Sequence, residues 1–378
     1  MEVKRGYRKT EVGVITDEWE VKPLEDVCSM KSGEGITAAQ IDQYSPYSCY
    51  GGNGIRGYTS RYTHDGSFAL IGRQGALCGN VVFVTGKFFA SEHAVVVTPR
   101  QGIDIQFMTY VLGEMQLNRL SEASAQPGLS VTKLLKLPVG VPQSHCEQRA
   151  IATALSDVDE LLTGLTQLIV KKRDLKQAAM QQLLIGKTRL PGFSGEWEVK
   201  RLGEITDCLD NLRVPLNESQ RDKMQGDYPY CGANGVLGFV DNYVIDDDII
   251  LVAEDGGYFD EYETRPIAYR MSGKCWVNNH AHILKAKQGT DQGFLYYSLV
   301  HKNILSFLAS GTRAKLNKSE MNKIEVCRPQ DPHEQTAIAE ALSDMDAEIS
   351  TLETRLEKTR ALKQGMMQEL LTGRIRLL

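Results

Sequence analysis

Short glycine-rich segments of this chain carry Arg, Gln, Asn and His side chains that are suited to hydrogen bonding rather than to bond cleavage. Arg73 and Gln74 follow an apolar run in the segment IGRQGALCG. An Arg side chain can pair with O6 and N7 of guanine, and a Gln side chain with N6 and N7 of adenine. Both residues are therefore candidate contacts to the base edges of DNA. A solvated turn is an equally good interpretation of the same segment.

The segment GGNGIRG, which begins at Gly51, formally fits the pattern of a dinucleotide-binding loop. Such a site requires that pattern between a strand and a helix, and the residues that follow here do not suggest a helix. A second copy, GANG, begins at Gly232. The favoured interpretation is a tight turn that requires a positive φ angle. In the alternative, Asn53, Arg56 and Asn234 contact DNA, because an Asn side chain can pair with adenine.

The segment VAEDGGYF occupies the place of IGRQGALCG in the second half of the chain. It carries Glu254 and Asp255 where the first half has Arg73 and Gln74, and Tyr258 follows them. An acidic side chain can accept a hydrogen bond from N4 of cytosine, so the exchange predicts two different DNA targets. Two neutral surface loops would show the same exchange.

His93 and His280 occupy corresponding positions in the segments SEHAVVV and NNHAHIL. A His at the entry to a strand most often supports the fold, and a DNA contact is the second interpretation. None of the eight Cys residues forms a C-x-x-C pair or has a His at the spacing of zinc ligands, so we expect no metal site. Scattered thiols of this kind are typical of a reduced, cytosolic protein.

Polar and basic residues also gather before each of two long helical segments, where they could contact phosphate groups. Simple solvation is the competing interpretation. The candidates are Ser130, Lys133, Arg313, Lys315, Asn317 and Lys318.

We find no motif for catalysis. The sequence contains neither the G-x-x-x-x-G-K-[ST] phosphate loop nor the N/D-P-P-Y/F motif of methyltransferases, and no catalytic triad recurs in both halves. We therefore predict no catalytic residues, and an enzyme that binds a nucleotide at the GGNG turns is disfavoured.

The elements that must position these residues occur twice. The segment EQRAIATALSDVD from Glu147 returns as EQTAIAEALSDMD from Glu334, and LKQAAMQQLLIGKTRL from Leu175 returns as LKQGMMQELLTGRIRL from Leu362. A repeat this long is one domain plus one helix duplicated in tandem, not a solenoid. We predict an arm over 1–17, mixed domains over 18–143 and 189–330, and helices over 144–188 and 331–378.

Each predicted helix carries apolar residues at alternating spacings of four and three, which is the seam of a coiled coil. The seam is predicted to break at Lys172 and Thr359. It is predicted to resume, shifted, at Leu175, Ala179 and Leu183 in the first helix and at Leu362, Met366 and Leu370 in the second. Because the termini of a domain often lie close together, we expect the two helices to be antiparallel. The seam consists of Ile151, Leu155, Val158, Leu162, Leu165 and Ile169 in the first helix, and Ile338, Leu342, Met345, Ile349, Leu352 and Leu356 in the second.

The fold class predicted from this pattern is α+β, with two mixed α/β domains related by a pseudo-two-fold axis and held apart by the antiparallel helices. Net charge is −5, which argues weakly against DNA binding by bulk attraction, and residues 241–263 hold nine acids and no Lys or Arg. No apolar run is long enough to span a membrane, and no secretory signal is expected at the N-terminus.

The order of these segments resembles the specificity (S) subunit of type I restriction–modification systems. The resemblance rests on GYRKTEVGVITDEWEVKPL, GGNGIRGY, SEHAVVV, LSVTKLLKLPVGVP, EQRAIATALSDVDELL and the helix ends LLIGKTRL and LLTGRIRL. It implies two target-recognition domains, each reading one half of a bipartite asymmetric site in double-stranded DNA. It also implies that the coiled coil sets the spacer between the halves and docks the methyltransferase subunits.

The resemblance further implies two methyltransferase (M) subunits and, in the full complex, restriction (R) subunits. The chain itself would hold no cofactor and do no chemistry, whereas the partners would use S-adenosylmethionine, ATP and Mg²⁺. The location expected is the cytoplasm of a bacterium or archaeon, at the nucleoid. The alternative is a coiled-coil scaffold whose two heads bind proteins, which the net acidity favours.

Overall fold

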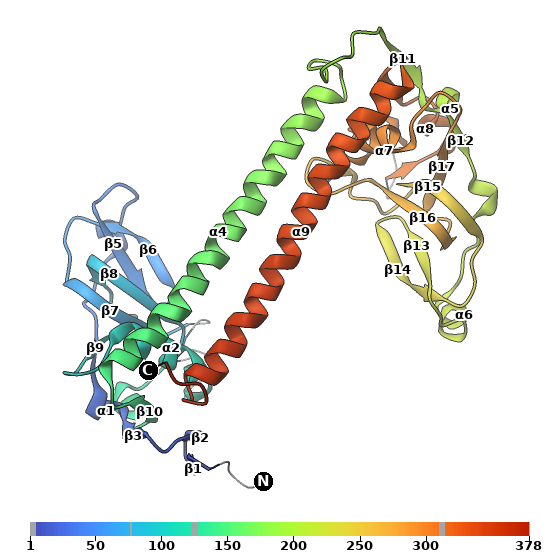
Figure 1. Cartoon of the computed structure of the whole chain (residues 1–378). Helices are drawn as coiled ribbons and strands as arrows, with labels where there is room; N and C mark the ends of the chain where they lie inside the picture. Colours follow the sequence, from blue (N-terminus) through green and yellow to red (C-terminus); the bar gives the residue numbers. More distant parts are fainter. Residues whose placement is uncertain (1–4, 76–77, 122–127, 310–313, 378) are drawn as a thin grey trace. The chain divides into compact units, whose positions relative to one another are not determined.

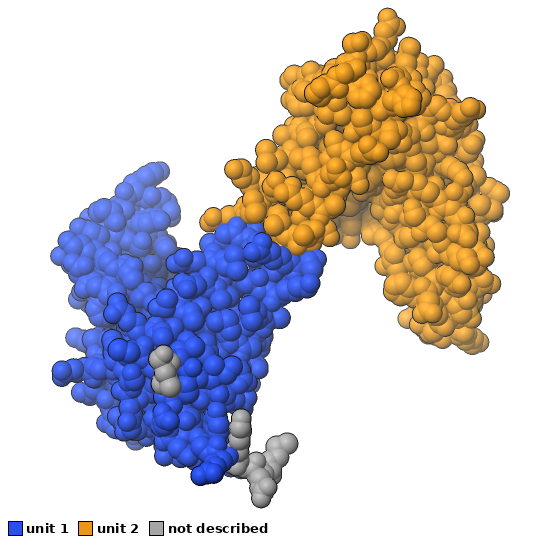
Figure 2. Space-filling model, in the orientation of Figure 1, with its two compact units in different colours: residues 1–166, 354–378 blue, residues 167–353 orange. Residues whose placement is uncertain are grey.

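The computed structural model describes residues 5–75, 78–121, 128–309 and 314–377, and these form two compact units (Figures 1 and 2). Unit 1 combines residues 1–166 and 354–378, and unit 2 consists of residues 167–353. The two units repeat the order of their six sheet strands, of the helix that covers the sheet and of the long helix that follows, and the α+β fold class predicted from the duplication is confirmed.

Unit 1 is built on a six-stranded sheet of order β4-β9-β7-β8-β5-β6, in which only the β5–β8 pair is parallel. Helix α2 packs against this sheet through the buried side chains of Phe107, Met108 and Leu112. The strands of the sheet are β4 (Cys28–Ser32), β5 (Tyr47–Gly51), β6 (Gly54–Thr59), β7 (His64–Gly72), β8 (Val81–Ala90) and β9 (Ala94–Pro99). The other short elements are β1 (Tyr7–Thr10), β2 (Gly13–Thr16), β3 (Trp19–Pro23), β10 (Pro138–Pro142), α1 (Leu24–Val27), α2 (Ile105–Glu114) and α3 (Val131–Leu135).

Unit 2 repeats this sheet in the order β12-β17-β15-β16-β13-β14, again with one parallel pair, β13–β16. Its strands are β12 (Thr206–Cys208), β13 (Tyr228–Gly232), β14 (Gly235–Val240), β15 (Ile245–Ala253), β16 (Ala268–Val277) and β17 (Ala281–Ala286). The other short elements are β11 (Trp197–Arg201), β18 (Leu308–Ala309), β19 (Lys315–Leu316), β20 (Glu325–Pro329), α5 (Leu202–Ile205), α6 (Glu218–Lys223), α7 (Gln292–Val300) and α8 (Lys318–Met321). Helix α7 covers the sheet as α2 does in unit 1.

Two long helices, α4 (His145–Leu183) and α9 (Pro332–Leu370), each contribute to both units. Each ends before a glycine with positive φ, as predicted: Gly186 at +69° and Gly373 at +67°. After each of them the chain closes a Schellman-type bond, from Lys187 N–H to Gln182 O and from Arg374 N–H to Glu369 O. A Cβ atom at Gly186 would lie 2.9 Å from the Trp197 ring, so close packing also requires glycine there.

The predicted apolar seam faces the interior of the protein: all twelve of its residues are buried or half-buried. The predicted shift of the seam is wrong at its first residue in each helix, whereas the residues predicted to follow, Ala179, Leu183, Met366 and Leu370, are buried or half-buried. Leu175 and Leu362 are exposed, at 47% and 58%. The seam instead continues without a break through polar residues: Thr359 is 7% exposed, and Lys172 and Lys176 are half-buried.

Ion pairs show that the two helices are antiparallel within each unit. In unit 2, Lys172 Nζ lies 2.8 Å from Glu348 Oε2, and Lys176 pairs with Asp346. In unit 1, Lys363 Nζ lies 2.6 Å from Asp159 Oδ1. Asp159 also accepts from Tyr110 of α2, as Asp346 does from Tyr297 of α7, so one aspartate ties three helices in each unit.

The start of each long helix is fixed by a buried Glu–Gln pair. Glu147 is 1% exposed, and its two carboxylate oxygens accept from Arg376, with Nη2 at 2.7 Å from Oε2. Gln148 donates to Pro142 O and Gly102 O and accepts from the Asp104 amide, which joins α4 to the loop before α2. Glu334, Arg189 and Gln335 repeat these contacts in unit 2.

Unit 1 also contains an antiparallel hairpin, β1–β2, that covers the small β3–β10 sheet. Ile15 is buried, and Trp19 beneath the hairpin is fully buried. The hydroxyl of Tyr7 donates to Arg374 O at 2.8 Å, which attaches the hairpin to the segment after α9. Among the described residues, none of the helices is both long and apolar enough to cross a membrane.

We predict that Arg376→Met lowers the free energy of unfolding of unit 1 by about 3–5 kcal/mol, because it leaves the Glu147 carboxylate buried without a counter-ion. Arg374→Met is the matched control, since Arg374 makes a more exposed contact of 3.4 Å with Glu369, and it should change stability by less than about 1 kcal/mol. Denaturant unfolding measures both. Equal effects of the two substitutions would contradict this account, whereas Glu147→Gln added to Arg376→Met should recover part of the loss.

Candidate nucleic-acid interface

Four segments of unit 1 meet at one end of the six-stranded sheet. They are the β5–β6 turn, the loop after β7, the β8–β9 turn and the segment before α3. The Arg73 amide donates to His93 O at 2.8 Å, and the Leu129 amide donates to Arg73 O at 3.0 Å. A Cβ atom at Gly52 would lie 2.7 Å from Gln74 O, which places the β5–β6 turn beside this loop.

Unit 2 repeats this arrangement with different side chains. The Glu254 amide donates to His280 O at 2.9 Å, and the Leu316 amide donates to Glu254 O at 2.7 Å. The side chain of Asn234, in the β13–β14 turn, donates to Gly256 O at 2.8 Å. The same two backbone hydrogen bonds therefore join three of these segments in both units, and the Gly-rich turn lies beside the loop in each.

A His is paired with the neighbouring loop in each unit. His93 Nδ1 lies 2.9 Å from Gln74 Oε1, and His280 Nδ1 lies 2.6 Å from Asp255 Oδ1. The two halves of the sequence match His93 with His280 and Gln74 with Asp255. The structure brings each His into contact with the matched loop residue of its own unit. Gln74 is exposed, and His93 and His280 are half-exposed, so both pairs reach the surface.

The Gly-rich turns join two strands rather than a strand and a helix, which excludes the dinucleotide-loop geometry. Gly54 and Gly235 have φ angles of +81° and +123°, so the predicted positive φ is confirmed. Asn53 and Arg56 are exposed at or beside the turn, and Arg56 lies across Gly51.

The remaining candidates lie near these segments, and some of them already contact other groups of the protein. Arg73 Nη1 donates to Ser32 Oγ at 3.1 Å, and the Arg265 guanidinium lies 3.1 Å from the centre of the Tyr258 ring. Arg313 lies outside the described residues. Ser130 precedes α3, Lys133 is exposed within α3, and Asn317 and Lys318 are exposed at the start of α8.

Glu254 is not available to a base edge, because internal cations hold its carboxylate. It is only 9% exposed, it pairs with Arg213, and it lies 2.9 Å from Lys315 Nζ. Lys315, a predicted phosphate contact, is thus shared with this internal ion pair. Asp255 is therefore the acidic side chain of this loop that remains half-exposed.

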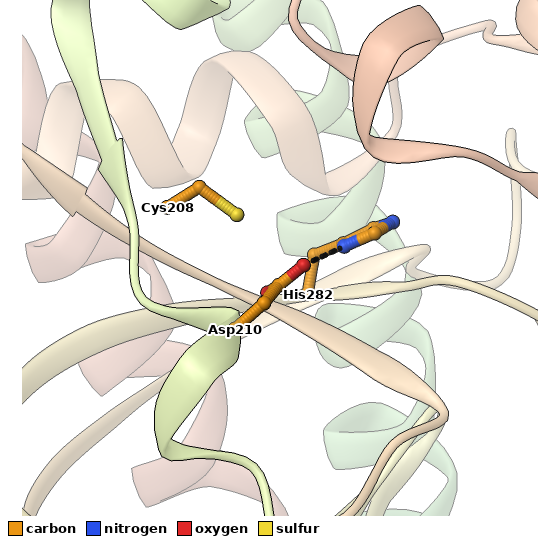
Figure 3. A group of neighbouring side chains, drawn as sticks. All are labelled: Cys208, Asp210 and His282. Carbon is orange, nitrogen blue, oxygen red and sulfur yellow. Dashed lines mark hydrogen bonds and ion pairs between the residues drawn. The ribbon is translucent and has the colours of Figure 1, made fainter.

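Beneath the loop lies a buried histidine that sequence reasoning missed (Figure 3). His282 Nδ1 lies 2.7 Å from Asp210 Oδ2, and Nε2 lies 2.8 Å from Leu316 O. Both ring nitrogens face acceptors, so the ring is a protonated imidazolium. Burial opposes this charge, but the interactions with Asp210, Cys208 and Leu316 O together outweigh burial and raise the pKa of His282 to about 9. Burial also opposes the charge of Asp210, yet His282 lowers the pKa of that carboxyl to about 2.

Cys208 completes a group with Asp210 and His282 whose ligand atoms lie within 4.8 Å of one another, so the group has the spacing of a metal site (Figure 3). The hydrogen bonds argue against that use, because His282 keeps no nitrogen lone pair for a metal. The sequence did carry a signal for this group, because two of its residues differ in type from their counterparts in the other copy. Strand register places His282 where unit 1 has Val95, and Asp210 where unit 1 has Ser32.

The acidic stretch 241–263 consists largely of paired groups. Asp247 pairs with Lys285, Asp248 with Arg270, and Glu261 with Arg265, in addition to the pairs of Glu254 and Asp255. These contacts lower the pKa of the Asp247 and Asp248 carboxyls. Much of the acidity of this stretch is therefore neutralised inside unit 2 and does not by itself indicate a protein partner.

Comparison with known proteins is consistent with this arrangement. Residues 16–172 and 194–360 match the family model described as type I restriction modification DNA specificity domain. The chain is 45% identical over 150 residues to the type I restriction enzyme EcoprrI specificity subunit of Escherichia coli, which covers 39% of this chain and 37% of that subunit. It is 24% identical over 219 residues to the type I restriction enzyme MjaVIII specificity subunit of Methanocaldococcus jannaschii, covering 50% of this chain and 51% of that one.

The chain thus spans about a third to a half of the length of these two relatives. A crystal structure of a type I restriction–modification S subunit from M. genitalium superimposes with a TM-score of 0.72. The match covers 98% of each chain at 19% identity, and at this identity it establishes the fold.

We predict that the stability of unit 2 falls as the pH rises from about 6.5 through about 9. The pKa of His282 is raised from 6.5 to about 9 on folding, so its stabilisation is complete below 6.5 and is lost through 9. The pKa of Asp210 is lowered from 3.8 to about 2, so its stabilisation is present above 3.8 and is lost as the pH falls through 2. Urea unfolding of wild type and His282→Gln between pH 6 and 10 measures the effect.

The difference between wild type and His282→Gln should be largest near pH 6 and should shrink towards pH 9. A difference that is constant over this range would show that His282 acts by packing alone. Asp210→Asn provides a second check, because without the carboxylate His282 should lose its proton at lower pH.

Proposed function

The chain belongs to the family of type I restriction–modification DNA specificity proteins, and we propose that each of its units reads one half of a bipartite, asymmetric DNA target. One observation carries the proposal: the same four segments meet at the same end of the same sheet in both units, but with different exposed side chains. Two domains that recognise different DNA sequences are expected to share a backbone geometry and to differ in the side chains that it presents.

In unit 1, Gln74 is the strongest candidate reader, because it is exposed and His93 fixes its orientation. Its Oε1 accepts from His93 Nδ1, which leaves the two N–H donors on Nε2 for another acceptor. Asn53, Arg56 and Arg73 surround it. In unit 2, Asp255 and His280 take the places of Gln74 and His93, and Asn234 and Tyr258 lie nearby. Phosphate contacts are assigned to Ser130, Lys133, Arg313, Lys315, Asn317 and Lys318.

The proposal extends to the partners of the chain. The long helices would set the spacer between half-sites and dock two methyltransferase subunits, and restriction subunits would join the full complex. The chain would not itself be an enzyme and would carry no cofactor, whereas the partners would bring S-adenosylmethionine, ATP and Mg²⁺. The complex would act on double-stranded DNA at the nucleoid of a bacterial or archaeal cytoplasm.

The alternative of a scaffold that binds only proteins loses its main support. That alternative rested on the net acidity and on the acidic stretch, and the structure pairs much of that stretch internally.

The deciding experiment is co-expression of this chain with the methyltransferase subunit of its host, followed by genome-wide mapping of N6-methyladenine. A bipartite asymmetric motif that disappears when the chain is omitted is the expected result. A stable complex that produces no new methylation motif would overturn the proposal and favour the scaffold that binds only proteins.

We predict that Gln74→Ala relaxes base preference in one half-site and that Asp255→Asn relaxes it in the other. Each well-made contact to a base edge is worth about 1–3 kcal/mol of discrimination. Methylation motifs from the two variants measure the effect, with Lys323→Ala, an exposed Lys paired with Glu320, as the control that should change neither half. If one substitution changed the base preference in both half-sites, the proposal that each unit reads one half-site would be contradicted.

A further inference from the structure

A groove of unit 2 and a groove of unit 1 lie at equivalent places in the repeat, but among the described residues only the groove of unit 1 is lined by a β-hairpin at its side. The cavity volumes are about 960 Å³ in unit 2 and about 520 Å³ in unit 1. The end of a long helix, the end of a short helix and one strand of the small sheet line both grooves. The matching residues include Met180 and Met367, Leu184 and Leu371, and Val326 and Val139.

In unit 1 the β1–β2 hairpin lines one side of this groove with two aliphatic side chains. Val12 and Ile15 line it, and a Cβ atom at Gly140 would lie 3.8 Å and 3.7 Å from them. Glu11 lies on the same hairpin and also lines the groove, beside Glu114 and Met115 of the α2 end. An extended segment with an acidic and two aliphatic side chains thus fits this type of groove.

In unit 2 the corresponding surface is bare. Residues 184–196, which the structure describes in full, contain no strand. Ile185, which lines the groove, is 60% exposed, and Val199 is 59% exposed. Val199 lies opposite Cys327 in the small sheet, as Val21 lies opposite Gly140 beneath the hairpin of unit 1. Aliphatic side chains exposed to this degree at one place are typical of an interaction site.

The charges in the groove of unit 2 favour an acidic occupant. Its acids are already engaged: Asp346 with Lys176, Glu353 with Arg173, and Glu263 with the Tyr262 hydroxyl. Lys302 takes the place of Met115 and forms no ion pair with any described residue, and burial lowers its pKa. His301 takes the place of Glu114, so the carboxylate present in the groove of unit 1 is absent here, and His301 Nδ1 donates to Tyr262 O at 2.7 Å.

We propose that the groove of unit 2 binds an extended or hairpin segment of a partner protein, with two aliphatic side chains in the places of Val12 and Ile15 and a carboxylate that pairs with Lys302. The inference rests on the proposed function, because the partner would be the methyltransferase subunit of the complex. A second copy of this chain is disfavoured, since its own hairpin is already bound in unit 1 and joined to Arg374 through Tyr7. The two units would then differ in how they bind their partners, despite the repeat.

The test uses the full chain purified in complex with the methyltransferase subunit of its host. Ile185 is replaced by the photocrosslinking residue p-benzoylphenylalanine, and Phe239, which is 54% exposed elsewhere in unit 2, is the matched control. We expect Ile185 to crosslink to an extended segment of the methyltransferase subunit that contains an acidic residue, and Phe239 not to crosslink to that segment. A crosslink from Ile185 to a second copy of this chain, or no crosslink from Ile185, would overturn the inference.

Lys302→Met provides an independent arm that does not depend on crosslinking. Met occupies this position in unit 1, so the variant should fold as stably as wild type, yet it should bind the methyltransferase subunit at least ~10-fold more weakly. Lys323→Met is the control with unchanged affinity. Unchanged affinity of Lys302→Met would overturn the inference, while a retained methylation motif would leave the proposed function intact. Loss of the wild-type complex together with the motif would instead refute the proposed function itself.

Discussion

Two buried ion pairs, Glu147–Arg376 and Glu334–Arg189, are the contacts on which the rest of the structure depends. A carboxylate that is 0–1% exposed is very costly without a counter-ion, so each long helix can begin only where the segment after the other helix supplies an arginine. This requirement makes the helices antiparallel within each unit. It also brings the short sheet strands Trp19–Pro23 and Trp197–Arg201 against the helix ends, through Gly373 and Gly186.

With the helix ends fixed, the far loops of each sheet are free to differ. Backbone hydrogen bonds hold Arg73 and Glu254 in the same position, whatever their side chains do. The side-chain exchange is then balanced locally. Arg73 bonds to Ser32, whereas Glu254 is surrounded by Arg213, Lys315 and the charged His282. A loop can therefore change charge without a change of fold when neighbouring segments supply a matching partner, which is a hydroxyl for Arg73 and cations for Glu254.

The sequence was sufficient for the parts of the structure that repeat, and insufficient for those that depend on long-range polar pairing. The helices and their glycine stops could be predicted because periodicity is a local signal, and His93 could be matched with His280 because the duplication is visible in the sequence. The antiparallel sense followed from the expectation that the termini of a domain lie close together. The seam beyond Lys172 was mispredicted because Glu348 and Asp346 make lysine an acceptable inward residue there. Cys208, Asp210 and His282 are brought together only by strand order, and the partner of His282 Nε2 is a backbone carbonyl.

The division of the chain into units has a consequence for the order of events during synthesis. Unit 2 is continuous from residue 167 to residue 353, whereas unit 1 needs residues 354–378 to complete it. A ribosome therefore delivers all of unit 2 before it delivers Lys363 and Arg376, and until then Asp159 and Glu147 have no counter-ions from that segment. The half of the protein whose synthesis starts first is thus the half that finishes folding last, and its two parts are joined across the whole length of unit 2.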